Sequence, residues 1–409
     1  MNYGCIGEHL PHSFSREIHE QIGGYAYELC EIAPNDLDAF MRARPFRAIN
    51  VTIPYKQAVI PYLSGISETA RAIGAVNTVV NRAGALYGYN TDFDGLSRLI
   101  GRTGVELAEK KVLVLGTGGT SRTAVYTARA MGAAQIHRVS RTGREGALTY
   151  EQAAREHGDA EVVINTTPCG MFPRTGGMPV DPGLFPRLSG VIDAIYNPLR
   201  SRLVLEAASR GIPAAGGLYM LVAQAVRAAE IFRDAPCPAG LAEEIYGRIL
   251  RQKENIVLIG MPGSGKSTVA GLLGRRLSRP AVDADERIAA RAGMSIPEIF
   301  ARFGEAYFRD LESEVIAGLS DGSGQVIATG GGAVLRARNV EALRRNGRLF
   351  LLDRPLEALL PSDDRPLGNT REKIERLYRE RMPLYRAAAD VVVAPGRTAE
   401  ETARDIESR

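Results

Sequence analysis

The sequence has no apolar run that reaches the roughly 18 residues needed to cross a bilayer. Its first residues, MNYGCIGEHLPHSFS, also lack the basic segment and the long apolar stretch of a secretory signal. The 51 basic and 47 acidic residues nearly balance, and no basic arm stands out. We therefore expect a cytoplasmic location, with neither a membrane nor a nucleic acid as partner.

Cysteine and lysine are both scarce. The four cysteines lie far apart without a CxxC pair, so neither a zinc site nor a disulfide framework is predicted. Only six of the 51 basic residues are lysines. A lysine kept inside a dense motif suggests a role for a compact charge that can lose its proton, which arginine cannot fill. Lys56 and Lys266 are the two lysines in such motifs.

The chain length points to several domains. A chain of 409 residues exceeds the size of one ordinary hydrophobic core, so we expect two or three domains. Its apolar fraction of 45% and charged fraction of 24% are typical of globular proteins. The short charged stretch RQKEN precedes a new apolar strand. We place the main boundary there, between residues 1–252 and residues 253–409.

Two glycine-rich turns, each after an apolar strand, predict the fold class α/β. The first lies in KVLVLGTGGTSRTA and is followed by the short runs IHRV, EVVINTT and VIDAIY. The second lies in NIVLIGMPGSGKSTV and is followed by AVDAD, QVIATGGG, RLFLLD and ADVVVAP. Helical stretches separate these strands, which is typical of parallel, doubly wound sheets.

Further elements precede and follow the first glycine turn. YELCEIA, FRAINVTIP and GAVNTVVNRAGALYGYNTD read as strands of a separate α/β domain of about 95 residues. The segments GLYMLVAQAVRAAEIF and LAEEIYGRIL read as helices between the middle domain and the boundary.

The first glycine turn is a variant of the dinucleotide fingerprint, GxGxxS. The pattern alone also fits a tight turn without a ligand. An NAD enzyme would place an acidic residue at the end of the next strand, but this chain has an arginine between two hydroxyl residues there. That arginine suits a 2′-phosphate, so NADP is the predicted cofactor. The residues predicted to bind it are Gly116, Gly118, Gly119, Ser140, Arg141 and Thr142.

The second glycine turn fits GxxxxGK[ST], a loop whose amides surround phosphates. Lys266 would contact the β and γ oxygens of ATP and Ser267 would bind Mg²⁺. The next strand ends in Asp283 and Asp285, and the third in a triple-glycine turn. Residues 309, 365 and 381 are arginines, suited to bidentate pairing with carboxylate or phosphate. The nucleotide-binding residues predicted in this loop are Gly263, Ser264, Gly265, Lys266, Ser267 and Thr268.

These motifs make the last 155 or so residues similar to shikimate kinases over nearly their whole length. The segments that carry the resemblance are the phosphate loop, AVDADERI, GEAYFRDLE, TGGGAV, DDRPL and RERMPLY. The resemblance implies that two arginines take the carboxylate of shikimate, and that Asp283 supports Mg²⁺ beside Ser267. It also implies that Arg365 reaches the phosphates from a lid. The shikimate-binding residues so implied are Asp285, Arg309, Gly331, Gly332 and Arg381.

The amino-terminal 250 residues resemble shikimate dehydrogenases, with HSFS, INVTIPYK, IGAVNTV, GYNTDFDG and GLYMLVAQA in that family's order. The resemblance implies a substrate domain of about 1–95 plus 218–252, to which the last helices return, and an NADP-binding domain of about 96–217. Lys56 and Asp92 would be the catalytic pair, and Gly217 would lie near the nicotinamide. Arg16 departs from the family, which usually has proline there. The implied substrate-binding residues are Ser13, Ser15, Thr52, Asn77, Asp92, Tyr196 and Gln224.

The two resemblances imply consecutive reactions on small molecules. The first is reduction of the C3 carbonyl of 3-dehydroshikimate by NADPH, in which Lys56 beside Asp92 donates the proton. The second is in-line transfer of the γ-phosphoryl of ATP to the 3-hydroxyl of shikimate, with Lys266, Mg²⁺ and Arg365 on the phosphates. Asp285 would orient or deprotonate that hydroxyl. The product of the first reaction is the substrate of the second.

Two alternatives remain at this point. The chain could join a quinate-using dehydrogenase to another small-metabolite kinase, and quinate oxidation usually goes with NAD. Alternatively, one half could bind a ligand without catalysis and act as a regulator. A decayed half should have lost Lys56 and Asp92, or Lys266 and Asp285, and all four are present.

Overall fold

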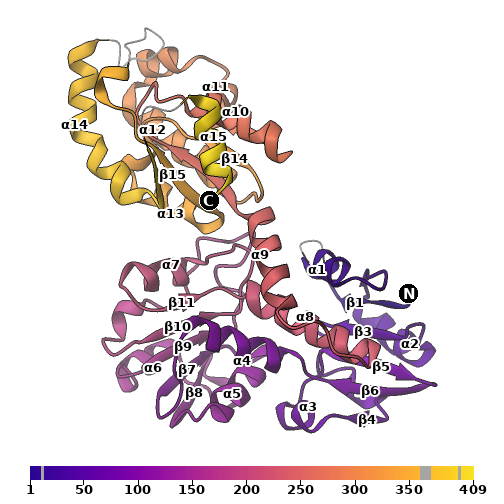
Figure 1. The fold of residues 1–409 in the computed structure, drawn as a ribbon. Helices are drawn as coiled ribbons and strands as arrows, with labels where there is room; N and C mark the ends of the chain where they lie inside the picture. Colours follow the sequence, from indigo (N-terminus) through magenta and orange to yellow (C-terminus); the bar gives the residue numbers. More distant parts are fainter. Residues whose placement is uncertain (11–12, 360–369, 395–397) are drawn as a thin grey trace. The chain divides into compact units, whose positions relative to one another are not determined.

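The computed structural model describes residues 1–10, 13–359, 370–394 and 398–409 (Figure 1). Chain contacts divide it into two compact units, Met1–Leu250 and Arg251–Arg409. Among the described residues, no helix is both long enough and apolar enough to cross a membrane.

The first unit begins with a six-stranded sheet in the order β2-β1-β3-β5-β6-β4. Strands β2, β1 and β3 are parallel, whereas β5 pairs antiparallel with both β3 and β6. The β5–β6 hairpin turns at Ala83 and Gly84, whose φ angles of 52° and 89° are those of a two-residue turn that follows the strand twist. The elements are β1 Tyr3–Gly7, α1 Ser15–Ile22, β2 Glu28–Glu31, α2 Leu37–Ala43, β3 Ala48–Val51, β4 Gly65–Ile66, α3 Glu68–Ile73, β5 Thr78–Arg82 and β6 Ala85–Tyr89.

A second sheet of this unit has the order β11-β10-β9-β7-β8 and is parallel throughout. This confirms the doubly wound arrangement predicted after the first glycine turn. The strands of this sheet are short. Almost every residue of β7, β9 and β10 is buried, as expected where helices cover both faces of a sheet. The elements are β7 Lys111–Leu115, α5 Gly119–Ala130, β8 Gln135–Val139, α6 Tyr150–Glu156, β9 Val162–Asn165, β10 Gly190–Asp193, α7 Arg202–Ser209 and β11 Ala214–Ala215.

Helix α4 (Asp92–Thr103) links the two sheets, and α8 (Leu218–Arg233) returns along it (Figure 1). The helices approach closely at Gly95, where a β-carbon would lie 2.5 Å from the carbonyl oxygen of Met220. Helix α8 also packs against α1 and β5. Its side chains therefore reach strand β5 of the first sheet although they follow the second sheet in sequence.

The charged stretch RQKEN, where the sequence predicts the main boundary, is mostly helical. Helix α9 runs from Leu241 to Lys253, and β12 begins at Asn255. Arginine, glutamine and lysine favour helices, so polarity alone did not mark a break. The guanidinium of Arg279 donates to the carbonyl oxygens of Arg251 and of Glu254, the latter at 3.0 Å. Arg251, Glu254 and Arg279 all belong to the second unit, so these contacts lie within it.

The second unit contains one parallel sheet in the order β13-β14-β12-β15-β16, with a hydrophobic core on each face. This confirms the second parallel sheet. Helix α12 starts with a capping box between Ser295 and Glu298 and is interrupted at Gly304, where φ is 77° and ψ 176°. The elements are β12 Asn255–Ile259, α10 Lys266–Leu277, β13 Ala281–Asp283, α11 Ala284–Ala292, α12 Ile296–Ser320, β14 Val326–Ala328, α13 Ala337–Asn346, β15 Gly347–Leu352, α14 Arg371–Ala388, β16 Val391–Val393 and α15 Ala399–Glu407.

Candidate active sites

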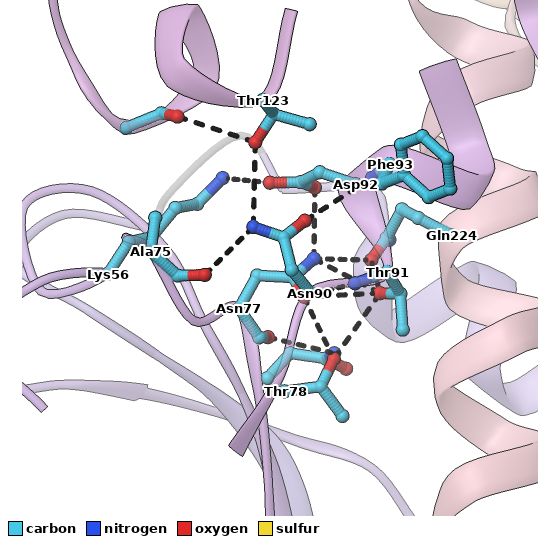
Figure 2. A network of polar contacts seen from close by, with 12 residues as sticks. Lys56, Ala75, Asn77, Thr78, Asn90, Thr91, Asp92, Phe93, Thr123 and Gln224 are labelled. Atoms are coloured by element: carbon cyan, nitrogen blue, oxygen red, sulfur yellow. Dashed lines mark hydrogen bonds and ion pairs between the residues drawn. The ribbon is translucent and has the colours of Figure 1, made fainter. Parts of the chain in front are cut away.

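In the first unit, Lys56 and Asp92 form a close ion pair. Lys56 Nζ lies 2.6 Å from Asp92 Oδ2, and their side chains are only 12% and 9% exposed. Lys56 follows strand β3, and Asp92 is the first residue of α4. Two elements far apart in sequence therefore bring an ammonium against a carboxylate, as the motifs predicted (Figure 2).

Asn77 and Gln224 join this pair. Asn77 Nδ2 donates to Asp92 Oδ1 at 2.9 Å and lies 3.5 Å from Gln224 Oε1. Gln224, on α8, also accepts from the hydroxyl of Thr91 at 3.3 Å. Four predicted residues from four parts of the chain thus form one buried polar cluster (Figure 2).

The other predicted substrate residues come from both sheets of the first unit: Ser13 and Ser15 lie at the start of α1, Thr52 follows β3, and Tyr196 follows β10 of the second sheet. The amide of Ser15 donates to Ser13 Oγ at 3.3 Å, which orders the start of α1. Phe14 between them packs on the ring of Tyr196, with centroids 5.2 Å apart. Burial raises the pKa of Tyr196 to about 12, so its phenol stays neutral. Thr52 follows β3 and its amide donates to the carbonyl of Ile6 at 2.9 Å.

Arg16 occupies the position at which the resemblance described above leads us to expect proline. It is the second residue of α1, and its guanidinium pairs with Glu20 at 2.8 Å on the exposed face. Both serines keep their places around it.

The first glycine turn forms an open cradle at the start of α5. Gly116 has φ 115°, and a β-carbon there would lie 2.6 Å from Thr166 Oγ1. A β-carbon at Gly118 would meet nothing within 4 Å, and no side chain caps the helix. The uncapped amides suit a pyrophosphate. At Gly119 a β-carbon would lie 3.5 Å from Lys56 Cδ, so the turn lies against Lys56.

The residues predicted to select the cofactor follow β8, the parallel neighbour of β7. Ser140 Oγ accepts from the amide of Gly143 at 3.1 Å, while Arg141 and Thr142 are exposed. The arginine therefore lies at the same sheet edge as the glycine turn. Gly217 precedes α8, and a β-carbon there would lie 2.3 Å from the carbonyl oxygen of Ala194, so only glycine fits.

Two residues of this region were missed by the sequence reasoning. Asn90 donates to the carbonyl of Ala75 at 2.9 Å and accepts from the amide of Phe93 at 3.2 Å, which fixes the start of α4 (Figure 2). It stands within the quoted motif GYNTDFDG, next to residues that were chosen. Asp193 is fully buried and accepts from the hydroxyl of Ser201 at 2.5 Å. Burial raises its pKa to about 6.

In the second unit, the phosphate loop lines a pocket of about 480 Å³. Lys266 is buried, and its ammonium donates to the carbonyls of Gly260 at 2.9 Å and Met261 at 3.0 Å. Of the predicted loop residues, Ser264 is not part of the lining and its hydroxyl is buried, so its nucleotide contact stays a prediction. The loop residues in the lining are Gly263, Gly265, Lys266, Ser267 and Thr268.

Ser267 and Asp283 meet as predicted for a metal site. The hydroxyl of Ser267 lies 2.5 Å from Asp283 Oδ2, and Asp283 Oδ1 accepts from the amide of Asp285 at 2.9 Å. A hydroxyl and a carboxylate beside a phosphate loop are oxygen ligands that suit Mg²⁺. Asp285 lines the same pocket, and burial, followed by the neighbouring charge of Asp283, raises its pKa to about 6.

Each glycine of the Gly330–Gly332 turn faces a different part of this pocket. A β-carbon at Gly330 would lie 2.5 Å from Asp285 Oδ1, and one at Gly331 would lie 2.6 Å from Pro262 Cγ. The turn therefore brings an acid and the phosphate loop into contact. Glycine is required at both positions because any side chain would occupy this space.

Arg309 and Arg381 reach the same turn. Arg309 pairs with Glu312 at 2.7 Å, and Arg381 donates to the carbonyl of Gly331 at 2.9 Å. Glu312 was missed, although an acid three residues after an arginine on a helix is a common partner for it. Tyr385 was also missed; its hydroxyl donates to the carbonyl of Gly331. Arg365 and the lid segment DDRPL lie outside the described residues.

Comparison with known proteins identifies both units. Residues 5–79 match the family model of the shikimate dehydrogenase substrate binding domain, and residues 262–409 match that of shikimate kinase. The shikimate dehydrogenase (NADP(+)) of Clostridium beijerinckii is 34% identical over 262 residues, which cover 60% of this chain and 96% of that protein.

Solved structures agree with the match of the first unit. A chorismate mutase/shikimate 5-dehydrogenase fusion protein from Clostridium acetobutylicum is 34% identical, with a TM-score of 0.57 over 60% of this chain and 96% of that one. The shikimate 5-dehydrogenase of Thermus thermophilus, in complex with NADP(H) and shikimate, is 29% identical, with a TM-score of 0.54 over 61% of this chain and 99% of that one. The chain belongs to the shikimate dehydrogenase family through its first unit and carries a shikimate kinase domain in its second.

Proposed function

We propose that this chain is a bifunctional enzyme that reduces 3-dehydroshikimate to shikimate with NADPH and then phosphorylates shikimate with ATP. The observation that carries the first activity is the Lys56–Asp92 pair, 2.6 Å apart, against the glycine turn at Gly119. A proton donor and a hydride donor are needed on one carbonyl, and the proximity of Lys56 to the glycine turn supports this assignment.

In the first reaction, bound NADPH supplies the hydride. Lys56 donates a proton to the C3 oxygen as that oxygen becomes an alkoxide, and Asp92 holds the ammonium in place. Asn77 and Gln224 border the same cluster and would orient the hydroxyl groups of the substrate. The Ser13 and Ser15 hydroxyls would bind its carboxylate, with Thr52 and Tyr196 beside it.

In the second reaction, bound ATP with Mg²⁺ supplies the phosphoryl group. Two features of the structure suit these ligands. Ser267 Oγ lies 2.5 Å from Asp283 Oδ2, and no side chain caps the start of helix α10, which follows the phosphate loop. Lys266 would then turn from the loop carbonyls to the phosphate oxygens. Asp285 would accept the proton of the attacking 3-hydroxyl, since its raised pKa makes it a stronger base than an ordinary aspartate.

The carboxylate of shikimate would lie on two arginines. Arg309 and Arg381 both line the pocket and are only 7% and 5% exposed, so their charges are poorly hydrated. Buried guanidinium groups bind a carboxylate in bidentate geometry. Gly331 and Gly332 lie between these arginines and the phosphate loop. Arg365 would neutralise the transferred phosphoryl group from the lid.

The proposed preference for NADPH over NADH can be tested by comparing the two cofactors. Arg141→Ala should raise KM for NADPH far more than KM for NADH, because only NADPH carries the 2′-phosphate. Arg144→Ala is the matched control, since Arg144 is another exposed arginine three residues further on. Equal effects on both cofactors would place Arg141 outside the site. Faster oxidation of quinate with NAD⁺ than of shikimate with NADP⁺ would support the quinate alternative.

The remaining expectations stay predictions. These are the cytoplasmic location, the boundary between residues 1–252 and residues 253–409, and the subdomains of about 1–95 plus 218–252 and about 96–217. The division at Leu250 and Arg251 lies two residues before the predicted boundary.

A further inference from the structure

A chain of buried polar groups leads from the catalytic carboxylate to a tyrosine hydroxyl that no motif includes. Tyr27 immediately precedes β2 and is 2% exposed. Its hydroxyl donates to Asn50 Oδ1 at 2.7 Å. Burial raises the pKa of Tyr27 well above its ordinary value, so the hydroxyl keeps its hydrogen and acts as a donor. Its ring stacks on His19, with centroids 3.8 Å apart and 4° between the planes.

This hydroxyl sets the orientation of the Asn50 amide. Asn50 Nδ2 donates to Thr78 Oγ1 at 3.1 Å and to the carbonyl oxygen of Asn77 at 3.3 Å. Asn50 and Thr78 are directly opposite each other in the antiparallel β3–β5 pair, so the contact follows from the register. With the amide turned over, Oδ1 would face the carbonyl oxygen of Asn77, acceptor against acceptor.

The orientation is passed on to the Asn77 side chain. Thr78 Oγ1 accepts from Asn50, so its single hydrogen is available for Asn77 Oδ1, which lies 3.1 Å away. Asn77 Oδ1 also accepts from the amide of Thr91 at 2.7 Å. Its amino group is thereby directed to Asp92 Oδ1 at 2.9 Å (Figure 2).

The orientation of the Asn77 amide also affects Lys56, the proposed proton donor. With Oδ1 of Asp92 occupied by Asn77, the other oxygen faces Lys56. We propose that the Tyr27 hydroxyl is a positioning group for the Lys56–Asp92 pair. It contacts neither residue of the pair and acts through Asn50 and the Asn77 amide. The inference rests on the proposed catalytic role of that pair.

Removing the hydroxyl should affect the chemical step more than substrate binding. In Tyr27→Phe the ring still stacks on His19, but Asn50 Oδ1 becomes a buried acceptor without its donor, and the Asn50 amide loses one of the contacts that hold its orientation. We expect kcat for 3-dehydroshikimate reduction to fall about tenfold, a part of the ~10²–10⁴-fold that a general acid contributes. KM should change less than about twofold, and the solvent deuterium isotope effect on kcat should increase.

Tyr25→Phe is the matched control. Tyr25 belongs to the same aromatic cluster, and its hydroxyl lies 2.6 Å from His19 Nδ1. Removing it deletes a hydroxyl of the same cluster that does not donate to Asn50, so kcat and the isotope effect should stay at wild-type values. Melting temperature and NADPH affinity are measured for every variant, because a purely structural role would move these quantities first.

Thr78→Val interrupts the same chain one step nearer the pair and should reproduce the loss in kcat. If the two hydroxyls act in one chain, the double variant Tyr27→Phe, Thr78→Val should be no slower than the slower single variant. A fold-loss in kcat of the double variant equal to the product of the two single losses would overturn the proposal. So would equal kcat in Tyr27→Phe and Tyr25→Phe, a raised KM with unchanged kcat, or loss of folding in Tyr27→Phe. A wild-type chain that does not reduce 3-dehydroshikimate would instead refute the proposed function.

Discussion

A β-carbon on Gly332 would lie 1.8 Å from Nη1 of Arg309, so the guanidinium occupies the space where any other residue would carry its side chain. Gly332→Ala should therefore displace Arg309 and raise KM for shikimate in the kinase reaction at least tenfold, the size expected from losing a charge-assisted pair worth ~1.5–3 kcal/mol. Initial rates against shikimate concentration check this. Gly318→Ala is the control, because a β-carbon there meets nothing within 4 Å.

Lys56→Ala should abolish most NADP-linked shikimate oxidation and leave kinase turnover near wild type. The variant removes the proton donor of the first unit alone, and a general acid contributes ~10²–10⁴-fold. Lys110→Ala, which breaks a partly exposed ion pair with Glu161, should leave both activities unchanged. A loss below tenfold in Lys56→Ala would remove Lys56 from the mechanism.

The kinase reaction should lose activity in mild acid because of Asp285. Its pKa is raised to about 6, mainly by burial, and it must be ionised to accept the proton of the 3-hydroxyl. We expect kcat/KM for shikimate to fall as pH drops through about 6. Asp285→Asn should bind ATP nearly as well as wild type while turnover collapses. If ATP affinity fell as much as turnover, Asp285 would be a metal ligand instead.

The raised pKa of Asp285 also predicts how the stability of the second unit depends on pH. Because the pKa of Asp285 is higher in the folded chain than the ordinary 3.8, the folded state binds its proton more tightly. This contribution to stability is present below about pH 4 and is lost as pH rises through about 6. Without ligands, Asp285→Asn should therefore raise the melting temperature of the second unit at pH 7 more than at pH 5. An equal gain at both values would contradict the raised pKa.

The two units should work when expressed separately, each with its own activity. A cut between Leu250 and Arg251 keeps the Arg279 caps on Arg251 and Glu254 with the second unit. A cut after Gln252 removes Arg251 from its cap and should lower the melting temperature of the kinase fragment. Mixed halves should convert 3-dehydroshikimate about as fast as the intact chain, because a small product reaches the second site by diffusion. Insoluble halves, or a long lag seen only with them, would contradict independence.

Much of the fold could be predicted because the strands are short apolar runs beside glycine turns. The P-loop strand NIVLI and the dinucleotide strand KVLVL are β12 and β7 as expected. Strand β1 was missed, since YGCIG has two glycines and only two strongly apolar residues. It lies between β2 and β3 because burial on both faces outweighs weak strand preference.

Candidate site residues could be predicted where they stand inside a dense sequence motif. Lys56 and Asp283 were singled out in this way, and in the structure each contacts a residue that was predicted beside it. Tyr27 was not, because its hydroxyl matters only through Asn50, 23 residues away in sequence and adjacent only after the strands pair. Tyr385 is similar: its partner is the carbonyl of Gly331, and a backbone oxygen leaves no signal in a sequence.

The most direct test of two consecutive activities is one reaction of the purified chain with 3-dehydroshikimate, NADPH, ATP and Mg²⁺, in which NADPH and ADP are followed together. Omitting NADPH should stop ADP formation, because no shikimate is made, and adding shikimate should restore it. Omitting ATP should leave NADPH oxidation running. ADP formed from 3-dehydroshikimate without NADPH, or no ADP when shikimate is supplied, would contradict the account.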